Sequence, residues 1–524
     1  MNKRKELTTS TYNFKGIINS NCMYVDKTKE IYKLISKPDG QFFMSRPRRF
    51  GKSLTLSTLE SFFKGEKELF KGLYIYDKDD LVWENYPIIK LSMNAMSSNT
   101  LEEFEENLAI ELKRIARRFK IKLETKRASQ RFKELIENLE FEKNKNVVIL
   151  IDEYDKPILD NILDKAEVLK IRTFLKNFYG IIKAMEEYLR FTFLTGVSKF
   201  TQVSVFSDLN NLDDISMDED FATICGFTQN ECEKYFDEWI VENAEKNKMS
   251  KKDYLQKIKV LYNGMRFSRK EITVYNPVSF TKAMDKGNFI HYWFETGTPS
   301  MLLKLLKKND YNIANFEGLK LDSATFSSYE VDNIKIEALL YQTGYLTIVD
   351  YDEETDVYTL SYPNNEVKTA FIRNLAEYFT PVSPAEYPTL LDHLVNALKH
   401  NDLDKIFNKI LKVFYSEINY DIKLKHERYY QSIFYVLFMM LGTRIETEVH
   451  TNDGRMDCVI KTDSHIYIFE FKLDKTTKEA IEQIKQKEYY NKYLLDEREL
   501  VLIGVNFNSN NGTIKEWEVE NIKS

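Results

Sequence analysis

The chain has 524 residues, more than a single hydrophobic core can organise, so we expect roughly two to four domains. Its composition, 43% hydrophobic and 30% charged with few Gly and Pro, is ordinary for a soluble globular protein and indicates no long flexible linker. The net charge of -6 excludes a uniformly basic nucleic-acid binder, although it permits a local basic groove.

Cysteine spacing and hydrophobic runs indicate the compartment. The four cysteines, Cys22, Cys225, Cys232 and Cys458, have neither disulfide nor metal-site spacing, so we expect reduced core thiols in a cytoplasmic protein. No apolar region follows the charged N-terminus, and the most hydrophobic run, residues 433–441, is too short to span a bilayer. The sequence therefore predicts a buried helix at 433–441 and no membrane partner.

The first predicted site is a loop near the N-terminus. Residues 41–44 predict a strand, residues 54–59 predict a helix, and the connecting segment 45–53 ends in Gly-Lys-Ser. A strand, a tight loop and a helix place backbone N–H groups and a helix N-terminus around phosphate oxygens. We therefore predict a phosphate-binding loop.

Within this loop, Lys52 is expected to reach the β- and γ-phosphates and Ser53 to bind Mg²⁺. The usual first glycine, seven residues before Ser53, is Arg46, which leaves only a tripeptide that is common by chance. The loop therefore needs support from a second motif. The predicted nucleotide-binding positions of the loop are Arg48, Arg49, Phe50, Gly51, Lys52, Ser53 and Leu54.

The two arginines of the loop have two readings. Their guanidinium groups could contact the phosphates or act on a neighbouring subunit of an oligomer. Equally, Arg48 and Arg49 could pair with acids on the surface of their own loop. The sequence leaves these alternatives open.

The second motif follows the apolar, β-branched run 147–151, which is typical of a strand buried on both faces of a parallel sheet. It ends in Asp152 and Glu153. In P-loop ATPases the first acid holds Mg²⁺ beside the loop hydroxyl, and an adjacent glutamate can act as general base. The alternative is an acidic, solvated turn, which a Gly-Lys-Ser upstream makes less favoured.

A third predicted strand, residues 189–196, ends in small polar residues. Thr195 and Ser198 are candidates for sensing the γ-phosphate, because the strand between two such motif strands often presents a polar residue there. A polar strand end that leads into a turn is an equally good reading.

The middle of the chain is predicted to contain a lid and a small mixed region. Helical patterns over 230–262 suggest the lid, and strand-like pieces occur at 338–341, 345–349 and 358–360. Helices with a β-hairpin suit a winged-helix-like domain, whose wing could touch nucleic acid or transmit nucleotide state. Nothing in this stretch is basic enough to require the DNA reading.

The C-terminal segment predicts a hairpin, with strands at 454–460 and 466–472. The short turn can bring Asp457 and Glu470 to one edge, and Glu470 and Lys472, two apart, share a face. Two carboxylates and a lysine suit phosphodiester cleavage assisted by Mg²⁺ or Mn²⁺, with the lysine orienting or deprotonating the nucleophile.

Two further residues complete this predicted site. Gln483 lies on a helix predicted over 477–493, and Glu427 lies on an upstream helix that could supply another metal ligand. A hairpin with surface charges is the alternative, but the ordered set of helix-Glu, strand-Asp, strand-Glu-x-Lys and helix-Gln favours a nuclease-like site.

Together these segments resemble bacterial predicted AAA-ATPase-like proteins that carry a C-terminal PD-(D/E)XK nuclease-superfamily domain. The resemblance covers most of the chain and rests on segments 24–28, 46–53, 151–155, 193–199, 262–267, 274–277 and 292–299.

The resemblance implies ATP binding at Lys52 and Ser53, Mg²⁺ at Ser53 and Asp152, and catalysis by Glu153. It also makes Arg46 a family trait. In the nuclease half, Asp457, Glu470 and Lys472 take the superfamily's motif positions. Met456 stands where the motif has its proline, which leaves activity open.

The expected fold class is α/β. We predict a P-loop ATPase core with a helix-flanked parallel sheet at 1–225, a helical lid at 226–300, a winged-helix-like region at 301–400 and a restriction-endonuclease-like domain at 401–524. The expected function is an ATPase whose nucleotide state gates a nuclease, on DNA rather than RNA, in processing or defence. The alternatives are a nucleotide-dependent switch whose inactive nuclease fold only binds nucleic acid or a protein partner, and an interaction scaffold.

Overall fold

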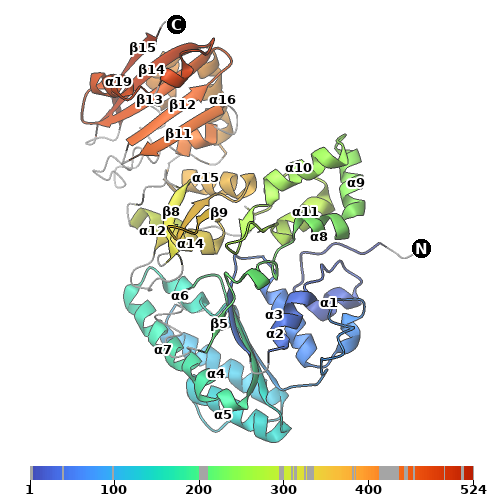
Figure 1. Cartoon of the computed structure of the whole chain (residues 1–524). Coiled ribbons are helices and arrows are strands. Elements are labelled where there is room, and N and C mark those ends of the chain that lie inside the picture. Colours follow the sequence, from blue (N-terminus) through green and yellow to red (C-terminus); the bar gives the residue numbers. More distant parts are fainter. Residues whose placement is uncertain are drawn as a thin grey trace. The chain divides into compact units, whose positions relative to one another are not determined.

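The computed structural model describes most of the chain, in two compact units (Figure 1). Unit 1 comprises Met1–Thr296 and Gly318–Val367, and unit 2 comprises Gly297–Glu317 and Lys368–Ser524. The finer division into four parts stays a prediction. The described residues are 4–37, 40–96, 99–199, 211–293, 300–308, 311, 316–323, 326, 335–379, 383, 385–411, 436–441, 446–452, 455–488, 490–508 and 513–522.

Unit 1 is built on a five-stranded parallel sheet in the order β2-β3-β4-β1-β5. The strands β1, β3 and β4 match the three strands predicted from the motifs, and β4 lies between the other two. Side chains of β1 and β3 are buried along their whole length, as expected for strands covered on both faces. The strands are β1 (Gln41–Ser45), β2 (Ile88–Ser92), β3 (Val147–Asp152), β4 (Leu189–Gly196) and β5 (Asp213–Asp214).

Helices surround this sheet. Because all five strands are parallel, their carboxyl ends meet at one edge, which brings Ser45, Asp152 and Gly196 together. The helices are α1 (Phe14–Asn19), α2 (Thr28–Ile35), α3 (Lys52–Phe63), α4 (Leu101–Arg118), α5 (Ala128–Lys143), α6 (Lys156–Asn161) and α7 (Lys165–Ala184), with short turns η1 (Lys67–Phe70), η2 (Met93–Met96), η3 (Glu186–Tyr188) and η5 (Glu219–Phe221).

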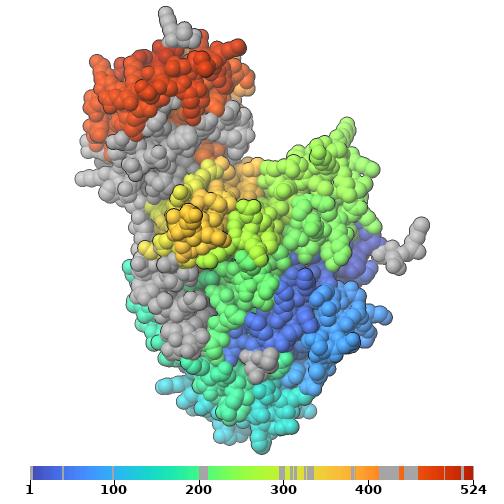
Figure 2. Space-filling view, in the orientation of Figure 1, coloured from blue at the N-terminus to red at the C-terminus, as the bar shows by residue number. Residues whose placement is uncertain are grey.

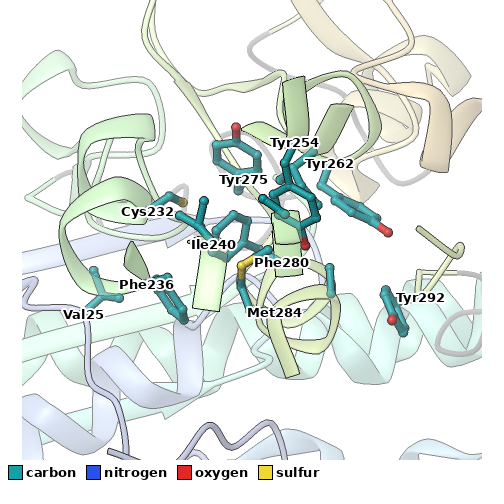
Figure 3. Packing of buried hydrophobic residues seen from close by; sticks show 13 residues of the cluster. Val25, Cys232, Phe236, Ile240, Tyr254, Tyr262, Tyr275, Phe280, Met284 and Tyr292 are labelled. Atoms are coloured by element: carbon teal, nitrogen blue, oxygen red, sulfur yellow. The ribbon is translucent and has the colours of Figure 1, made fainter. Parts of the chain in front are cut away.

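A helical subdomain follows the sheet, as the pattern over 230–262 predicts. Figure 3 shows its core, in which Phe236, Ile240 and Phe280 pack with several tyrosines and with Val25 from the N-terminal segment. Figure 2 shows the surfaces of the N-terminal segment and this subdomain meeting on one face of unit 1. Its elements are α8 (Gln229–Tyr235), α9 (Asp237–Lys246), α10 (Lys251–Tyr262), β6 (Met265–Arg266), β7 (Thr273–Val274) and α11 (Pro277–Lys286).

The last part of unit 1 contains an antiparallel sheet in the order β8-β10-β9, with strands β8 (Leu319–Asp322), β9 (Thr347–Asp352) and β10 (Val357–Ser361). The strand predicted at 338–341 is wrong, because these residues lie in helix α14 (Ile336–Thr343). A short apolar run is compatible with a buried strand or a buried helix, and α14 is buried along almost its whole length.

Unit 2 contains a five-stranded mixed sheet in the order β11-β12-β13-β14-β15, in which only β13 and β14 are parallel. The fold class predicted from the sequence, α/β with a parallel sheet and a second α/β domain, is therefore confirmed. The strands are β11 (Glu446–Asn452), β12 (Arg455–Lys461), β13 (His465–Leu473), β14 (Glu499–Asn508) and β15 (Thr513–Ile522).

Helix α19 packs on β14 of this sheet. The predicted helix over 477–493 is too long, because α19 (Thr477–Gln486) ends before Glu488, which has a left-handed φ of 53°. The buried helix predicted at 433–441 is confirmed over residues 436–441. The remaining helices are α12 (Ser300–Lys308), α15 (Asn365–Phe379), which begins in unit 1, α16 (Tyr387–Lys399), η7 (Lys405–Leu411) and η9 (Asn491–Tyr493).

Across the described ranges, no helix is both long enough and apolar enough to cross a membrane.

Candidate functional sites

The first candidate site is the loop between β1 and α3. Gly51 has a φ of 105°, which L side chains rarely adopt, and a Cβ added there would meet nothing within 4 Å. Helix α3 begins directly after it, at Lys52. The loop therefore ends in open space at a helix N-terminus, where backbone N–H groups are available to an anion.

Three predicted residues meet at the carboxyl edge of the sheet. Ser53 Oγ donates a hydrogen bond to Oδ2 of Asp152 at 2.6 Å, and Thr195 Oγ1 donates to Oδ1 of the same carboxylate at 2.7 Å. The strand β3 positions Asp152, while β4 and α3 bring the two hydroxyls to it. A hydroxyl and a carboxylate in contact beside a phosphate-binding loop fit the oxygen ligands that Mg²⁺ prefers.

Lys52 is buried inside the curve of its own loop. Its ammonium donates to the backbone carbonyls of Arg46 at 2.8 Å and Pro47 at 2.9 Å. Burial lowers the pKa of Lys52, while the carboxylates of Asp152 and Asp155 oppose that shift. These two carbonyls thus hold the lysine at the loop. A phosphate group could take their place as the hydrogen-bond acceptor of the lysine.

Glu153 follows Asp152 and has a left-handed φ of 54°, an uncommon conformation for a residue other than glycine. It is partly buried. Burial and the neighbouring Asp152 raise the pKa of Glu153, and Lys52 and Arg48 act in the opposite direction. A carboxylate with a raised pKa next to an acid at a strand end suits a general base.

The structure brings Thr195 to Asp152 but gives Ser198 a different partner. Asp155 accepts hydrogen bonds from the Ser198 hydroxyl at 2.5 Å and from the backbone N–H groups of Ser198 and Val197 at 2.7 and 3.1 Å. Ser198 is fully buried. Its contact with nucleotide stays a prediction, whereas its bond with Asp155 fixes the turn after β4.

Arg46 has a structural role that sequence patterns do not reveal. Its side chain is 1% exposed and donates to the carbonyls of Ser45 (2.9 Å), Ser216 (2.7 Å) and Phe221 (3.0 Å). The guanidinium also lies over the ring of Phe267, 4.4 Å from its centre. Arg46 therefore joins the start of the loop to the segment after β5.

The other two loop arginines face outward to different degrees. Arg48 is exposed, and Arg49, with a φ of 64°, is partly buried at the rim of a cavity. In the described parts of the chain, neither forms an ion pair with a surface acid. Contact of the two guanidinium groups with phosphate stays a prediction.

The cavity beside the loop has a volume of about 880 Å³ and mostly apolar walls. Its apolar lining and its position next to Gly51 suit a nucleoside. Three parts of unit 1 form its walls: the N-terminal segment, the loop with α3, and the helical subdomain. Among the lining residues are Thr8, Thr11, Tyr24, Val25, Phe50, Gly51, Leu54, Thr55, Ile224, Cys225, Phe227, Phe236 and Val278.

The second candidate site is in unit 2. Strands β12 and β13 pair with Asp457 directly opposite Glu470, as the hairpin prediction required. The side chain of Asp457 and the whole of Glu427 lie outside the described part of the structure. The contribution of these two residues to a metal site therefore stays a prediction.

The other three predicted residues of this site form one network. Lys472 Nζ donates to Oε1 of Glu470 at 2.8 Å and to Oε1 of Gln483 at 2.6 Å. The side-chain amide of Gln483 also donates to Oε1 of Glu470. Glu470 and Lys472 are both buried, whereas Gln483 is partly exposed at the edge of the network.

Two residues that the sequence analysis missed position this network. Asn506 is fully buried on β14, and its amide bonds the backbone N–H and carbonyl of Lys475, at 3.1 and 2.5 Å. These bonds fix the turn between β13 and α19. Gly504 lets α19 approach, because a Cβ there would lie 2.6 Å from the carbonyl of Thr477. The sequence feature that could have identified them is the presence of a polar residue and a glycine inside the apolar run of β14.

Comparisons with known proteins match the two parts of the chain that contain these sites. The model of a predicted AAA-ATPase family matches residues 9–206, and that of the PD-(D/E)XK nuclease superfamily matches residues 425–517. An uncharacterized protein in the vnfD 5′ region of Azotobacter chroococcum mcd 1 is 35% identical over 509 residues, which cover 95% of each chain. The chain belongs to the predicted AAA-ATPase-like family with a PD-(D/E)XK nuclease-superfamily domain.

Membership of this family implies nucleotide and divalent-metal use in general. Within the described residues, no three His, Cys, Asp or Glu side chains gather into a ready metal site. Mg²⁺ sites of phosphate chemistry fit this observation, because the ion is commonly held by one or two carboxylates together with substrate phosphates and water. Asp152 with Ser53, and Glu470 in unit 2, fit that pattern.

Proposed function

We propose that the chain binds and hydrolyses ATP in unit 1, and that its nucleotide state gates a Mg²⁺-dependent nuclease in unit 2 that acts on DNA in preference to RNA. The observation that carries the proposal is the contact of Ser53 and Thr195 with the two oxygens of Asp152 beside the phosphate-binding loop. Hydroxyls from two different elements thus converge on a single acid at the ligand-binding edge of a parallel sheet.

In the ATPase half, the apolar cavity is proposed to hold the base and the loop to hold the phosphates. Mg²⁺ held by Ser53 and Asp152 would neutralise charge on the phosphate oxygens. The carboxylate of Glu153 would accept a proton from the attacking water. Its raised pKa makes it a better proton acceptor than an ordinary surface glutamate.

In the nuclease half, Glu470 and Asp457 are proposed to hold Mg²⁺ or Mn²⁺ and Lys472 to orient the attacking water. The buried network of Glu470, Lys472 and Gln483 supports this reading. Cys225, Cys232 and Cys458 are buried and form no disulfide in the described chain, which supports a reducing bacterial cytoplasm. The exposed Arg48 leaves room for action across an oligomer.

A nucleotide-dependent switch is the second candidate. Two observations favour it: Lys472 and Gln483 already engage Oε1 of Glu470, and Met456 replaces the motif's proline. In that case unit 2 would bind nucleic acid or a protein without cutting it.

The test uses the purified full chain with linear DNA and RNA, Mg²⁺ or Mn²⁺, and ATP or a non-hydrolysable analogue. We expect Lys52→Ala to abolish ATP binding. Glu153→Gln should retain binding but lower hydrolysis by roughly 10²- to 10⁴-fold. Glu470→Gln should abolish cutting and leave hydrolysis unchanged. Wild-type protein that hydrolyses ATP but cuts neither polymer would favour the switch.

A further inference from the structure

The end of α4 and the segment that follows it form the most basic stretch of the chain. Residues 113–127, here called the basic connector, contain eight Lys or Arg and one acid, Glu124, in a chain whose net charge is -6. All eight cations are exposed, and Arg114 is the one that forms an ion pair among the described residues, with Glu111 at 3.1 Å. The eight are Lys113, Arg114, Arg117, Arg118, Lys120, Lys122, Lys126 and Arg127.

The basic connector has a fixed backbone although much of it is neither helix nor strand. The carboxylate of Glu134 accepts hydrogen bonds from the N–H groups of Glu124 and Thr125, at 2.7 and 3.0 Å. Arg131 donates to the carbonyls of Thr125 and Ala109, at 2.9 and 2.7 Å. Both anchors lie on α5, which packs beside α4 (Figure 1). The cations are therefore displayed in a preorganised arrangement.

The stability of helices α4 and α5 does not explain why the basic connector contains so many cations. Arg117 and Arg118 in the last turn of α4 do suit the helix dipole. However, Lys126 and Arg127 stand at the N-terminus of α5, where the dipole disfavours cations, and the first turn of α5 contains no acid.

Lys120 has a backbone conformation that is unfavourable for a residue other than glycine or asparagine. It has a φ of 63° just beyond the end of α4, a position that favours Gly or Asn. The positive charges at Lys120, Lys126 and Arg127 therefore do not follow from local conformational preference, and they are consistent with binding an anion.

A hollow of about 670 Å³ adjoins the basic connector. Arg118 and Phe119 line it together with Tyr86, Lys64 and Lys90. Within it, Glu60 bridges the two lysines, at 2.6 Å from Lys64 and 2.7 Å from Lys90. Three cations and one carboxylate leave the hollow with an excess of positive charge, and Tyr86 adds an aromatic surface.

We propose that the basic connector and this hollow form a surface in unit 1 that binds the phosphate backbone of a nucleic acid. Guanidinium groups match phosphate oxygens through two parallel hydrogen bonds. The choice of a nucleic acid over other polyanions rests on the proposed function. Binding at this surface does not require that unit 2 cuts the polymer.

The test compares two full-length variants that each lose four positive charges. In the connector variant Lys113, Arg117, Lys122 and Lys126 are changed to Gln, and in the control variant Lys234, Lys248, Lys252 and Lys259 of the helical subdomain are changed to Gln. All eight side chains are exposed. Binding of fluorescein-labelled single-stranded and duplex oligonucleotides is followed by anisotropy over a KCl series in EDTA.

We expect the connector variant to bind at least about tenfold more weakly and to lose about three units of the slope of log affinity against log salt. The control variant should stay within about twofold of wild type. Equal loss in both variants, or no loss in either, would overturn the proposal. So would binding to phosphatidylserine vesicles or heparin with none to oligonucleotides.

A cleavage assay on the same proteins separates this inference from the proposed function. If the wild type cuts no DNA but binds it more tightly than the connector variant does, the nucleic-acid-binding surface is supported and the nuclease activity is rejected. If the connector variant still cuts DNA and binds it with unchanged affinity, the surface is rejected and the nuclease activity is supported.

Discussion

Arg46 occupies the position where a phosphate-binding loop usually begins with glycine, and the structure shows what the arginine does there. Its guanidinium satisfies carbonyls of Ser45, Ser216 and Phe221 from within the protein. The burial of its charge lowers the pKa of Arg46, so this arrangement has a cost. The side chain thus supports the loop from behind, through backbone carbonyls of the protein itself.

Restoring the usual glycine should therefore weaken the protein. We expect Arg46→Gly to lower the free energy of unfolding by about 2–4 kcal/mol, because three buried carbonyls lose their donor and a cavity remains. ATP affinity should not improve. Arg48→Gly, a matched change at an exposed position two residues on, should cost less than about 1 kcal/mol. Urea unfolding and nucleotide titration measure both effects; tighter ATP binding by Arg46→Gly would contradict the structural role.

Glu366 is a second buried charge with a measurable consequence. It is 1% exposed in the first turn of α15 and accepts a hydrogen bond from the N–H of Trp293 at 2.8 Å. Burial raises the pKa of Glu366 to about 7, although the N–H groups of Trp293 and Tyr292, the Ser279 hydroxyl and Lys282 oppose the shift.

Because the folded state holds this proton more tightly than the unfolded state, stability should fall as pH rises. The loss begins near the unfolded pKa, about 4.3, and is complete above about 7, with a total of up to about 3 kcal/mol. Glu366→Gln should remove this component, and Glu377→Gln, at an exposed position on the same helix, should retain it. Urea unfolding from pH 5 to 8.5 is the measurement; identical pH profiles for wild type and Glu366→Gln would refute the assignment.

The candidate sites were partly predictable at this scale. Ser53, Asp152 and Thr195 come together, as do Glu470, Lys472 and Gln483, because strand ends and two-residue spacing fix where side chains gather. Arg46 and Asn506 were not predictable in the same way. Their partners are backbone carbonyls and amides distant in the sequence, and no local pattern records such contacts.

At the scale of elements, the close contact of α19 with β14 decides the geometry of the second site. Gly504 permits this contact, and α19 carries Gln483 to Lys472. We expect Gly504→Ala to cost about 1–3 kcal/mol, since its Cβ would meet the backbone carbonyl of Thr477.

Gly180, in helix α7, provides the control for this substitution. A Cβ added at Gly180 meets nothing within 4 Å, so Gly180→Ala should be neutral or stabilise the helix by up to about 1 kcal/mol. Chemical denaturation of both variants tests the pair. Equal stability of Gly504→Ala and wild type would mean that α19 can shift freely.

Sequence patterns predicted most of the elements that carry the sites. The strands at 41–44, 147–151 and 189–196 and the hairpin around Asp457 are present because long apolar runs and alternation have a clear period. The misassigned segment 338–341 had only four apolar residues, too few to distinguish the two periods. The end of α19 depended on a left-handed residue other than glycine, which the sequence does not mark.

At the scale of the whole molecule, two compact units with separate candidate ligands should unfold in separate steps. We expect calorimetry to show two transitions. ATP with Mg²⁺ at about 100 times its Kd should stabilise one of them by about 2.7 kcal/mol, and Lys52→Ala should remove that shift. Glu470→Gln should alter only the other transition. If calorimetry shows a single unfolding transition, and both ATP binding and Glu470→Gln shift its temperature, the chain unfolds as one cooperative unit.

The chain passes between the units three times, since residues 297–317 belong to unit 2 and 318–367 to unit 1. A single genetic crossover after residue 367 would transfer a C-terminal segment that lacks residues 297–317 of unit 2. A crossover before residue 297 would also transfer residues 318–367, which belong to unit 1. Inheritance of the two units is thereby tied together: unit 2 as a whole cannot be exchanged between genes by a single crossover.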